Sequence, residues 1–155
     1  MKILLVYDIF MPDYVGGGEI MTYNIAKTLV KHGHDVKVLT TGDPKIKSYD
    51  GIETIRLPVN RFFLNGMVYP IYTHAKSADI IHIFNYNPCI PSWLVSKLLN
   101  KPVVCTILGV YLDDWLEIKG QLIGRMFKEI EKIQVNRSFD RIIFFSNFSR
   151  RLGLK

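Results

Sequence analysis

Short apolar runs alternate along the chain with segments of helical period. Residues 2–7 read KILLVY, an almost continuous aliphatic run that is typical of a parallel strand buried on both faces. In residues 19–32 apolar pairs recur every four positions, which predicts a helix with one buried stripe, and Gly33 supplies its stop. The pattern therefore predicts that the chain begins with a central strand followed by an amphipathic helix.

The same alternation continues to the end of the sequence. The remaining apolar runs predict five further strands, at residues 36–41, 53–57, 79–84, 102–108 and 140–145. Two further helices are predicted at residues 92–99 and 121–137, and another begins near Ser146. This order predicts an α/β fold, a Rossmann-like doubly wound parallel sheet with helices on both faces. In such sheets ligands bind beyond the carboxyl ends of the strands.

The composition is that of one folded domain. The 155 residues are 48% hydrophobic and 12% aromatic, which excludes a disordered chain. No segment approaches the roughly 18 uncharged residues of a membrane span. The two cysteines support neither a disulfide framework nor a metal cluster. We therefore expect a soluble, cytoplasmic protein without a signal peptide, a bound metal or a cofactor.

The net charge of +6 is concentrated in the last quarter of the chain. Lys and Arg balance Asp and Glu in residues 1–118, whereas basic residues exceed acidic ones in residues 119–155. A basic end could face a phosphorylated ligand, an anionic membrane or a nucleic acid, or could simply keep the domain soluble. Because no aromatic residues are interleaved on a basic face and no known module is present, we do not expect a nucleic-acid partner.

A glycine run, Gly16 to Gly18, lies with Glu19 where the first helix begins. Glycine lets the backbone come close to a ligand, and the first N–H groups of a helix favour an anion such as phosphate. Eight residues separate Tyr7 from Gly16, which is too many for the dinucleotide fingerprint, and no Lys and Ser/Thr pair follows as in a P-loop. Two interpretations remain: a phosphate-binding loop and a purely structural tight turn.

Several segments resemble motifs of one enzyme family. Gly16–Glu19 and Gly33–Val36 resemble a G-G-x-E/Q loop and a G-H-x-V segment. Ala78–His82 resembles an A-D-I-I-H strand, Lys101–Val104 a k-P-v-v strand, and Phe139–Ser146 an a-D-x-v-i-x-x-S strand. In this order and spacing, over nearly the whole chain, they resemble the amino-terminal half of the GT-B retaining glycosyltransferases of family 4.

The resemblance implies a role for the whole chain. Residues 1–155 would form the acceptor-side, Rossmann-like domain of an enzyme that moves a sugar from a nucleotide-diphosphate sugar to a hydroxyl on a sugar or lipid-linked acceptor, with retention of configuration. The carboxyl-terminal donor-binding domain would be absent from this chain, so the isolated chain is expected to be inactive. The donor diphosphate loop would consist of Gly16, Gly17, Gly18 and Glu19. Glu19 could cap or orient that loop, or could be a solvated acid of the first turn.

The acceptor site is expected at the carboxyl ends of two neighbouring strands. Asn85, Tyr86 and Asn87 leave the strand at residues 79–84 and could touch the acceptor, although such residues are also ordinary in turns. Tyr111, Asp113, Asp114 and Trp115 follow the strand at residues 102–108. Carboxylates accept hydrogen bonds from hydroxyls and aromatic rings cover the apolar face of a sugar, while the same residues also fit a helix N-terminus.

One position departs from the family pattern. The family usually has a histidine of the reaction centre where this chain has Leu108, whose side chain forms no hydrogen bond. No catalytic residue is therefore predicted. Either the enzyme works without that histidine, or the chain is a catalytically inactive binding or regulatory module of the same fold. His82 does not replace it, and we interpret His82 as a core or strand-end histidine.

An aromatic segment, Arg61 to Lys76, is interrupted by Gly66 and Pro70. Most of it is expected to lie in the core or in a covering loop. Because some members of the family bind membranes through an apolar and basic element in this half, a peripheral membrane contact is a further hypothesis.

Overall fold

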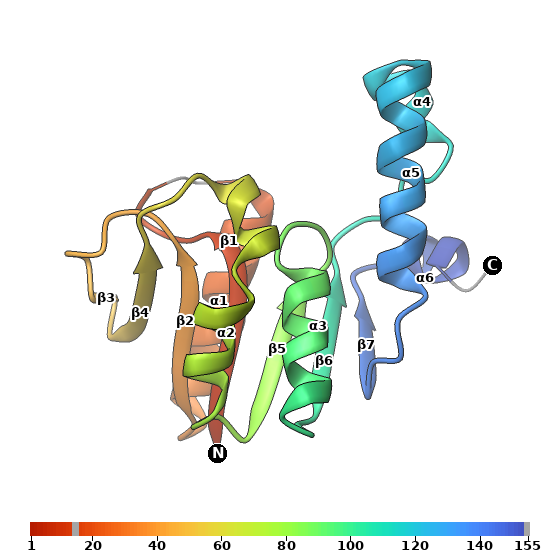
Figure 1. Cartoon of the computed structure of the whole chain (residues 1–155). Coiled ribbons are helices and arrows are strands. Elements are labelled where there is room, and N and C mark those ends of the chain that lie inside the picture. Colours follow the sequence, from red (N-terminus) through yellow and green to blue (C-terminus); the bar gives the residue numbers. More distant parts are fainter. Residues whose placement is uncertain (14–15, 154–155) are drawn as a thin grey trace.

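The computed structural model describes residues 1–13 and 16–153 and shows one twisted sheet whose strands are parallel except at one edge. The order across the sheet is β3-β4-β2-β1-β5-β6-β7 (Figure 1). The strands are β1 (Lys2–Ile9), β2 (Asp35–Thr41), β3 (Ser48–Tyr49), β4 (Ile52–Leu57), β5 (Ile80–Phe84), β6 (Val103–Ile107) and β7 (Arg141–Phe144). The six predicted strands are confirmed.

The seventh strand, β3, was missed. It pairs antiparallel with β4 through a tight turn in which Asp50 and Gly51 both have positive φ. A strand of two residues is too short to show an alternating pattern in the sequence, so no signal pointed to it.

Helices cover both faces of the sheet, as predicted. They are α1 (Gly17–Lys31), α2 (Val68–Ala75), α3 (Cys89–Leu98), α4 (Asp114–Lys119), α5 (Gln121–Val135) and α6 (Asn147–Gly153), with a 3₁₀ helix η1 (Arg61–Gly66). In Figure 1, α1 lies behind the sheet and α2 and α3 lie in front of it. The doubly wound arrangement is therefore confirmed.

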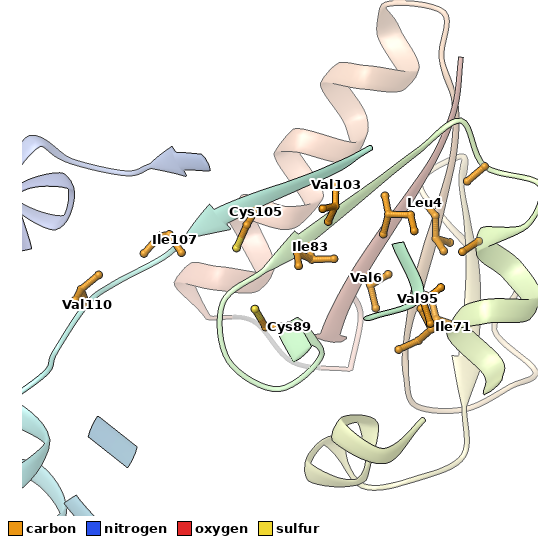
Figure 2. Packing of buried hydrophobic residues seen from close by; sticks show 14 residues of the cluster. Leu4, Val6, Ile71, Ile83, Cys89, Val95, Val103, Cys105, Ile107 and Val110 are labelled. Carbon is orange, nitrogen blue, oxygen red and sulfur yellow. The ribbon is translucent and has the colours of Figure 1, made fainter. Parts of the chain in front are cut away.

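The strand β1 is buried between two hydrophobic clusters. Its Leu4 and Val6 belong to the cluster that includes residues of α2 and α3, which Figure 2 shows from close by. Its Ile3 and Leu5 belong to the other cluster, together with Ala26 of α1. Burial of a large aliphatic side chain stabilises a fold by about 1.5–3 kcal/mol, so β1 needs apolar residues at successive positions. The continuous apolar run at residues 2–7 therefore reflects the burial of β1 on both faces.

The aromatic segment is helical rather than a loop, which corrects the sequence-based expectation. Pro70 falls in the first turn of α2, where a missing N–H and a fixed φ are tolerated, so it does not break the helix. Leu64 and Ile71 are buried, whereas Phe62, Phe63 and Tyr69 are exposed. Cys89 is buried at the start of α3, which begins three residues before the predicted helix at residues 92–99.

A helical hairpin, α4 and α5, extends past the carboxyl ends of the strands (Figure 1). Gly120, with a φ of 77°, separates the two helices. A Cβ atom on Gly124 would lie 2.4 Å from the carbonyl oxygen of Trp115, so only glycine allows the two backbones to pack this closely. Within residues 1–13 and 16–153, no helix combines the length and apolarity that crossing a bilayer requires.

Candidate functional site

A cleft lies at the carboxyl edge of the sheet, between β1 and β5. At this point the helical connections begin to run to opposite sides of the sheet. From β1 the chain continues through α1 to β2 on one side, and from β5 it continues through α3 to β6 on the other. Connections that diverge in this way leave a crevice between the two strands. The cleft measures about 440 Å³, within the range of small-molecule sites. Its lining includes Asp8, Arg61, Asn85, Tyr86, Tyr111 and Trp115.

Five of the seven predicted acceptor residues line this cleft, namely Asn85, Tyr86, Asn87, Tyr111 and Trp115. The Asn85 amide is also a structural link, because it accepts a hydrogen bond from the Leu108 N–H at 2.8 Å and donates one to the Gly109 carbonyl at 2.8 Å. It thereby fixes the loop after β6 to the end of β5.

The other two predicted residues, Asp113 and Asp114, stand at the start of α4 and do not line the cleft. The Asp113 side chain is 75% exposed and forms an ion pair with Lys128 of α5. The hydrogen bond from Lys128 lowers the pKa of the Asp113 carboxyl. Their assignment to an acceptor stays a prediction, and the structure gives Asp113 a partner within the hairpin.

The backbone of Tyr86 is clamped by α5. Its φ is 83°, a region that residues with a side chain rarely occupy. Gln134 holds it there, because the amide oxygen accepts from the Tyr86 N–H at 2.9 Å and the amide nitrogen donates to the Tyr86 carbonyl at 3.0 Å. Burial, followed by the charge of Glu131, raises the pKa of the Tyr86 phenol, so this hydroxyl is a hydrogen-bond donor.

Glu131 fixes the loop that carries Tyr111. One carboxylate oxygen accepts from the N–H groups of Tyr111 at 3.0 Å and Leu112 at 2.7 Å. The other oxygen lies 3.3 Å from the Tyr86 hydroxyl, and the residue is only 1% exposed. A single helix therefore positions Tyr86 and Tyr111 of the predicted acceptor site.

Sequence reasoning missed Glu131 and Gln134, because the amphipathic pattern of α5 suggests the opposite orientation. Isoleucines such as Ile130 and Ile133 form the apolar stripe that normally faces a core. In the structure both are more than 40% exposed, while Glu131, Gln134 and Gly124 face inward. Two polar residues three positions apart in a helix carry no signal of this role.

Asp8, at the end of β1, connects the cleft to η1. Its carboxylate oxygen Oδ2 lies 2.7 Å from Nη2 of Arg61 and accepts a hydrogen bond from the Asn87 amide at 2.8 Å. Asn87 in turn accepts one from the Asn65 amide at 3.1 Å. Asp8 is 3% exposed. Of these four residues, only Asn87 was predicted as a site residue, although an acid directly after a buried strand is a readable signal.

The glycine run combines one open position with one tightly packed position. A Cβ on Gly17 would meet no atom within 4 Å, so the backbone there is free to approach a ligand. A Cβ on Gly18 would lie 2.1 Å from the Tyr7 hydroxyl oxygen and 3.4 Å from Leu108 Cδ1. Tyr7 also lines the cleft, so the glycine run and the cleft share a wall.

The residues around the glycine run change two of the sequence-based expectations, those for Glu19 and Leu108. Glu19 is buried in the first turn of α1, so the interpretation as a solvated acid is wrong. Burial first, and then the charges of Asp8 and Glu19, raise the pKa of the Tyr7 phenol. Because Leu108 Cδ1 stands 3.4 Å from where a Cβ on Gly18 would lie, the apolar residue at the position of the family's expected histidine lies close to the glycine run.

The loop that leads to the glycines is anchored by a buried cation. The Arg56 guanidinium of β4 forms an ion pair with Asp13 at 2.5 Å and donates to the Met11 carbonyl. The Arg56 side chain is fully buried in this contact. Because removing one partner of a buried ion pair leaves the other charge uncompensated, Arg56 fixes the path of residues 11–13 after β1.

His82 is a core histidine, as interpreted from the sequence. It lies in β5, its Nε2 is 2.8 Å from the Thr106 hydroxyl oxygen, and its ring stacks on Phe84. Burial lowers its pKa to about 4.

This pKa predicts an acid-sensitive fold. Because the folded pKa lies below the unfolded value near 6.5, the unfolded chain binds the proton more readily as the pH falls. The contribution of His82 to stability is complete above pH 6.5 and is lost as the pH falls through 4; the loss amounts to about 3 kcal/mol. We expect His82→Gln to reduce the fall in the free energy of unfolding, measured with urea, between pH 6.5 and pH 4. His32→Gln, at an exposed position, should leave this fall unchanged. Equal pH slopes in the wild type and His82→Gln would contradict this assignment.

Among residues 1–13 and 16–153, no group of three or more His, Cys, Asp or Glu side chains is arranged to hold a metal ion.

Comparison with known proteins gives the class of the fold. Sucrose-phosphate synthase from Thermosynechococcus elongatus superposes with a TM-score of 0.70 at 17% identity over 91% of this chain and 41% of that chain. Anabaena HepE in complex with UDP-glucose superposes with a TM-score of 0.68 at 19% identity over 99% and 40%. A putative UDP-N-acetylglucosamine 2-epimerase from Listeria monocytogenes reaches 0.59 at 10% identity over 99% and 41%. At these identities the likeness shows the fold, which is that of one Rossmann-like half of a GT-B architecture.

The sequence itself gives the family. The family described as Glycosyltransferase Family 4 matches residues 15–155, so the chain belongs to that family. A search of curated proteins finds no sequence relative. The chain spans about two fifths of the length of the similar structures.

Proposed function

We propose that this chain is the acceptor-side half of a retaining glycosyltransferase, which moves a sugar from a nucleotide-diphosphate sugar to a hydroxyl acceptor. One observation carries the proposal: a cleft with polar and aromatic walls lies beside a glycine run whose Gly17 is open to a ligand. Membership of the family and the likeness to HepE, which was solved with UDP-glucose, support it.

In this proposal the two parts of the site have separate tasks. Gly17 brings backbone N–H groups of α1 towards the donor diphosphate, and the helix dipole favours its charge. Asn85, Tyr86 and Tyr111 lie at the acceptor. A second, carboxyl-terminal domain holds most of the donor, so residues 1–155 act as the amino-terminal domain and show no measurable transfer by themselves.

A catalytically inactive binding module is the second candidate, and Leu108 is the observation that favours it. Leu108 places an aliphatic carbon close to the glycine run, where the family usually has a histidine. Such a module would bind a nucleotide or a sugar without transferring it.

A titration of UDP into the ¹⁵N-labelled chain tests the donor loop. We expect the amide signals of Gly16 to Glu19 to shift in a saturable way, with weak affinity because one domain supplies only part of the contacts. Gly17→Ala is the matched variant, because its added methyl enters the open space and blocks the close approach without straining the fold. Shifts confined to other parts of the chain would contradict the loop assignment.

We also propose a peripheral membrane contact through η1 and α2. Phe62 and Phe63 are 63% and 66% exposed, and Tyr69 is exposed on the next helix. Since insertion of one phenylalanine contributes about 1.5–3 kcal/mol, the double substitution Phe62→Ser and Phe63→Ser should weaken sedimentation with phosphatidylglycerol vesicles at least about tenfold. Leu98→Ser, at an equally exposed position on α3, is the control. Failure of the wild type to sediment at low salt would refute the contact.

A further inference from the structure

The buried polar atoms that lack a hydrogen-bond partner gather in one place. Among the described residues, five side-chain atoms are buried without such a partner. Three of them belong to residues that line the cleft described above, between the ends of β1 and β5. They are Oδ1 of Asp8, Nε of Arg61 and Nε1 of Trp115. Buried polar groups are normally paired, so an accumulation of unpaired ones in a cleft points to a ligand.

We propose that Asp8 and Arg61 anchor an uncharged hydroxyl group of the acceptor at the base of this cleft. The inference rests on the proposed function and deepens it, because it assigns the chemical class of the acceptor and names two residues outside the predicted site. Trp115, which the sequence placed near the acceptor together with Tyr111, supplies a third contact.

The donor and acceptor pattern matches a hydroxyl. The Asp8 oxygen Oδ1 only accepts hydrogen bonds, whereas the Arg61 Nε–H only donates them. A hydroxyl group does both, so one hydroxyl or two adjacent ones satisfy the pair. The second oxygen of Asp8 is already used by Arg61 and Asn87, which fixes the carboxylate in place.

The charge beside the unpaired Asp8 oxygen disfavours an anionic group at this position, although Lys119 also lines the cleft. The Arg61 guanidinium stands 2.7 Å from the Asp8 carboxylate, so its charge is compensated. A phosphate or carboxylate that approached Arg61 would also approach the unpaired oxygen of Asp8 and be repelled by it. An uncharged polyol meets no such repulsion.

The aromatic wall fits the apolar face of a sugar ring. Trp115 packs against Tyr111 with ring centroids 5.0 Å apart, and its centroid lies 6.3 Å from that of Tyr86. All three rings line the same cleft as Asp8. Amphipathic rings of this kind cover the C–H face of a sugar while their polar atoms reach hydroxyls.

Binding of simple glycosides to the full chain tests the inference. The probes are methyl α-D-glucopyranoside, methyl α-D-mannopyranoside and methyl β-D-galactopyranoside, with glucose 6-phosphate and inorganic phosphate as anionic comparisons. In ¹⁵N spectra we expect at least one uncharged glycoside to shift the amides of Asp8, Tyr86 and Tyr111 and the Trp115 indole signal. The anionic compounds should not compete for this position.

Substitutions then identify the anchor. Asp8→Asn should weaken glycoside binding about tenfold or more, because a charged acceptor is lost. Asp35→Asn, an identical change at the exposed amino end of β2, should have no effect. Arg61→Gln is the second variant, because Asp8→Asn alone leaves the Arg61 charge uncompensated. Circular dichroism must show that each variant is folded.

The outcomes separate this inference from the proposed function. Cleft shifts with the uncharged glycosides that Asp8→Asn and Arg61→Gln both weaken would support it. Absence of cleft shifts with all three glycosides, equal binding of glucose 6-phosphate, or unchanged affinity in the folded variants would overturn it. If UDP still shifts Gly16 to Glu19 in that case, the proposed function stands and only the acceptor class is wrong.

Discussion

Glu131→Ala is expected to destabilise the protein by about 3 kcal/mol. The buried carboxylate accepts hydrogen bonds from the N–H groups of Tyr111 and Leu112, and nothing else among the described residues replaces them. Removing it leaves two partly buried donors unpaired and a cavity beneath the loop after β6. Urea unfolding followed by circular dichroism measures the loss.

Glu129→Ala is the control for this substitution. Glu129 lies two residues earlier in α5, its side chain is 61% exposed, and its partner is Lys132 on the same helix. An exposed pair of this kind contributes about 0.5 kcal/mol at most. Equal effects of the two substitutions would mean that α5 stabilises the loop by other contacts.

Gly18→Ala is expected to cost about 2 kcal/mol, because the added methyl must displace the buried Tyr7 ring. Its Cβ would stand 2.1 Å from the Tyr7 hydroxyl oxygen, which is closer than any non-bonded contact allows. Gly17→Ala should leave the free energy of unfolding within about 0.5 kcal/mol of the wild type, since its Cβ enters open space. Thermal and urea unfolding of the two variants provide the comparison.

This pair of variants separates the two interpretations of the glycine run. Gly18 fits the structural interpretation, whereas the ligand-binding interpretation of Gly17 stays a proposal that the UDP titration tests. If Gly17→Ala proved as destabilising as Gly18→Ala, or if it bound UDP like the wild type, the ligand-binding interpretation of Gly17 would fail.

The sequence predicts those parts of the fold in which burial repeats at regular positions along the chain. The strand β1 and the helix α1 were predicted because a buried strand needs continuous apolar residues and a covering helix needs a four-residue period. The strand β3 is too short for a period. The orientation of α5 was not predictable, because its inward residues bind loop backbone rather than a hydrophobic core.

The same distinction holds for the candidate site. Asn85, Tyr86 and Tyr111 could be placed because they follow apolar strands, whose ends define one edge of the sheet. The pairs that shape the cleft join distant positions, such as Asp8 with Arg61 and Tyr86 with Gln134. No local pattern couples residues some fifty positions apart, so these contacts required the structure.

The clamping of two loops by α5 matters for any attempt to change acceptor specificity by transplanting segments between relatives. A graft limited to residues 109–119 would exchange Tyr111 and Trp115 but keep Glu131 and Gln134, which are matched to the original backbone. The unit that can be exchanged as a piece is therefore the loop together with the whole of α5, and the turn at Tyr86 has to be compatible with the incoming helix.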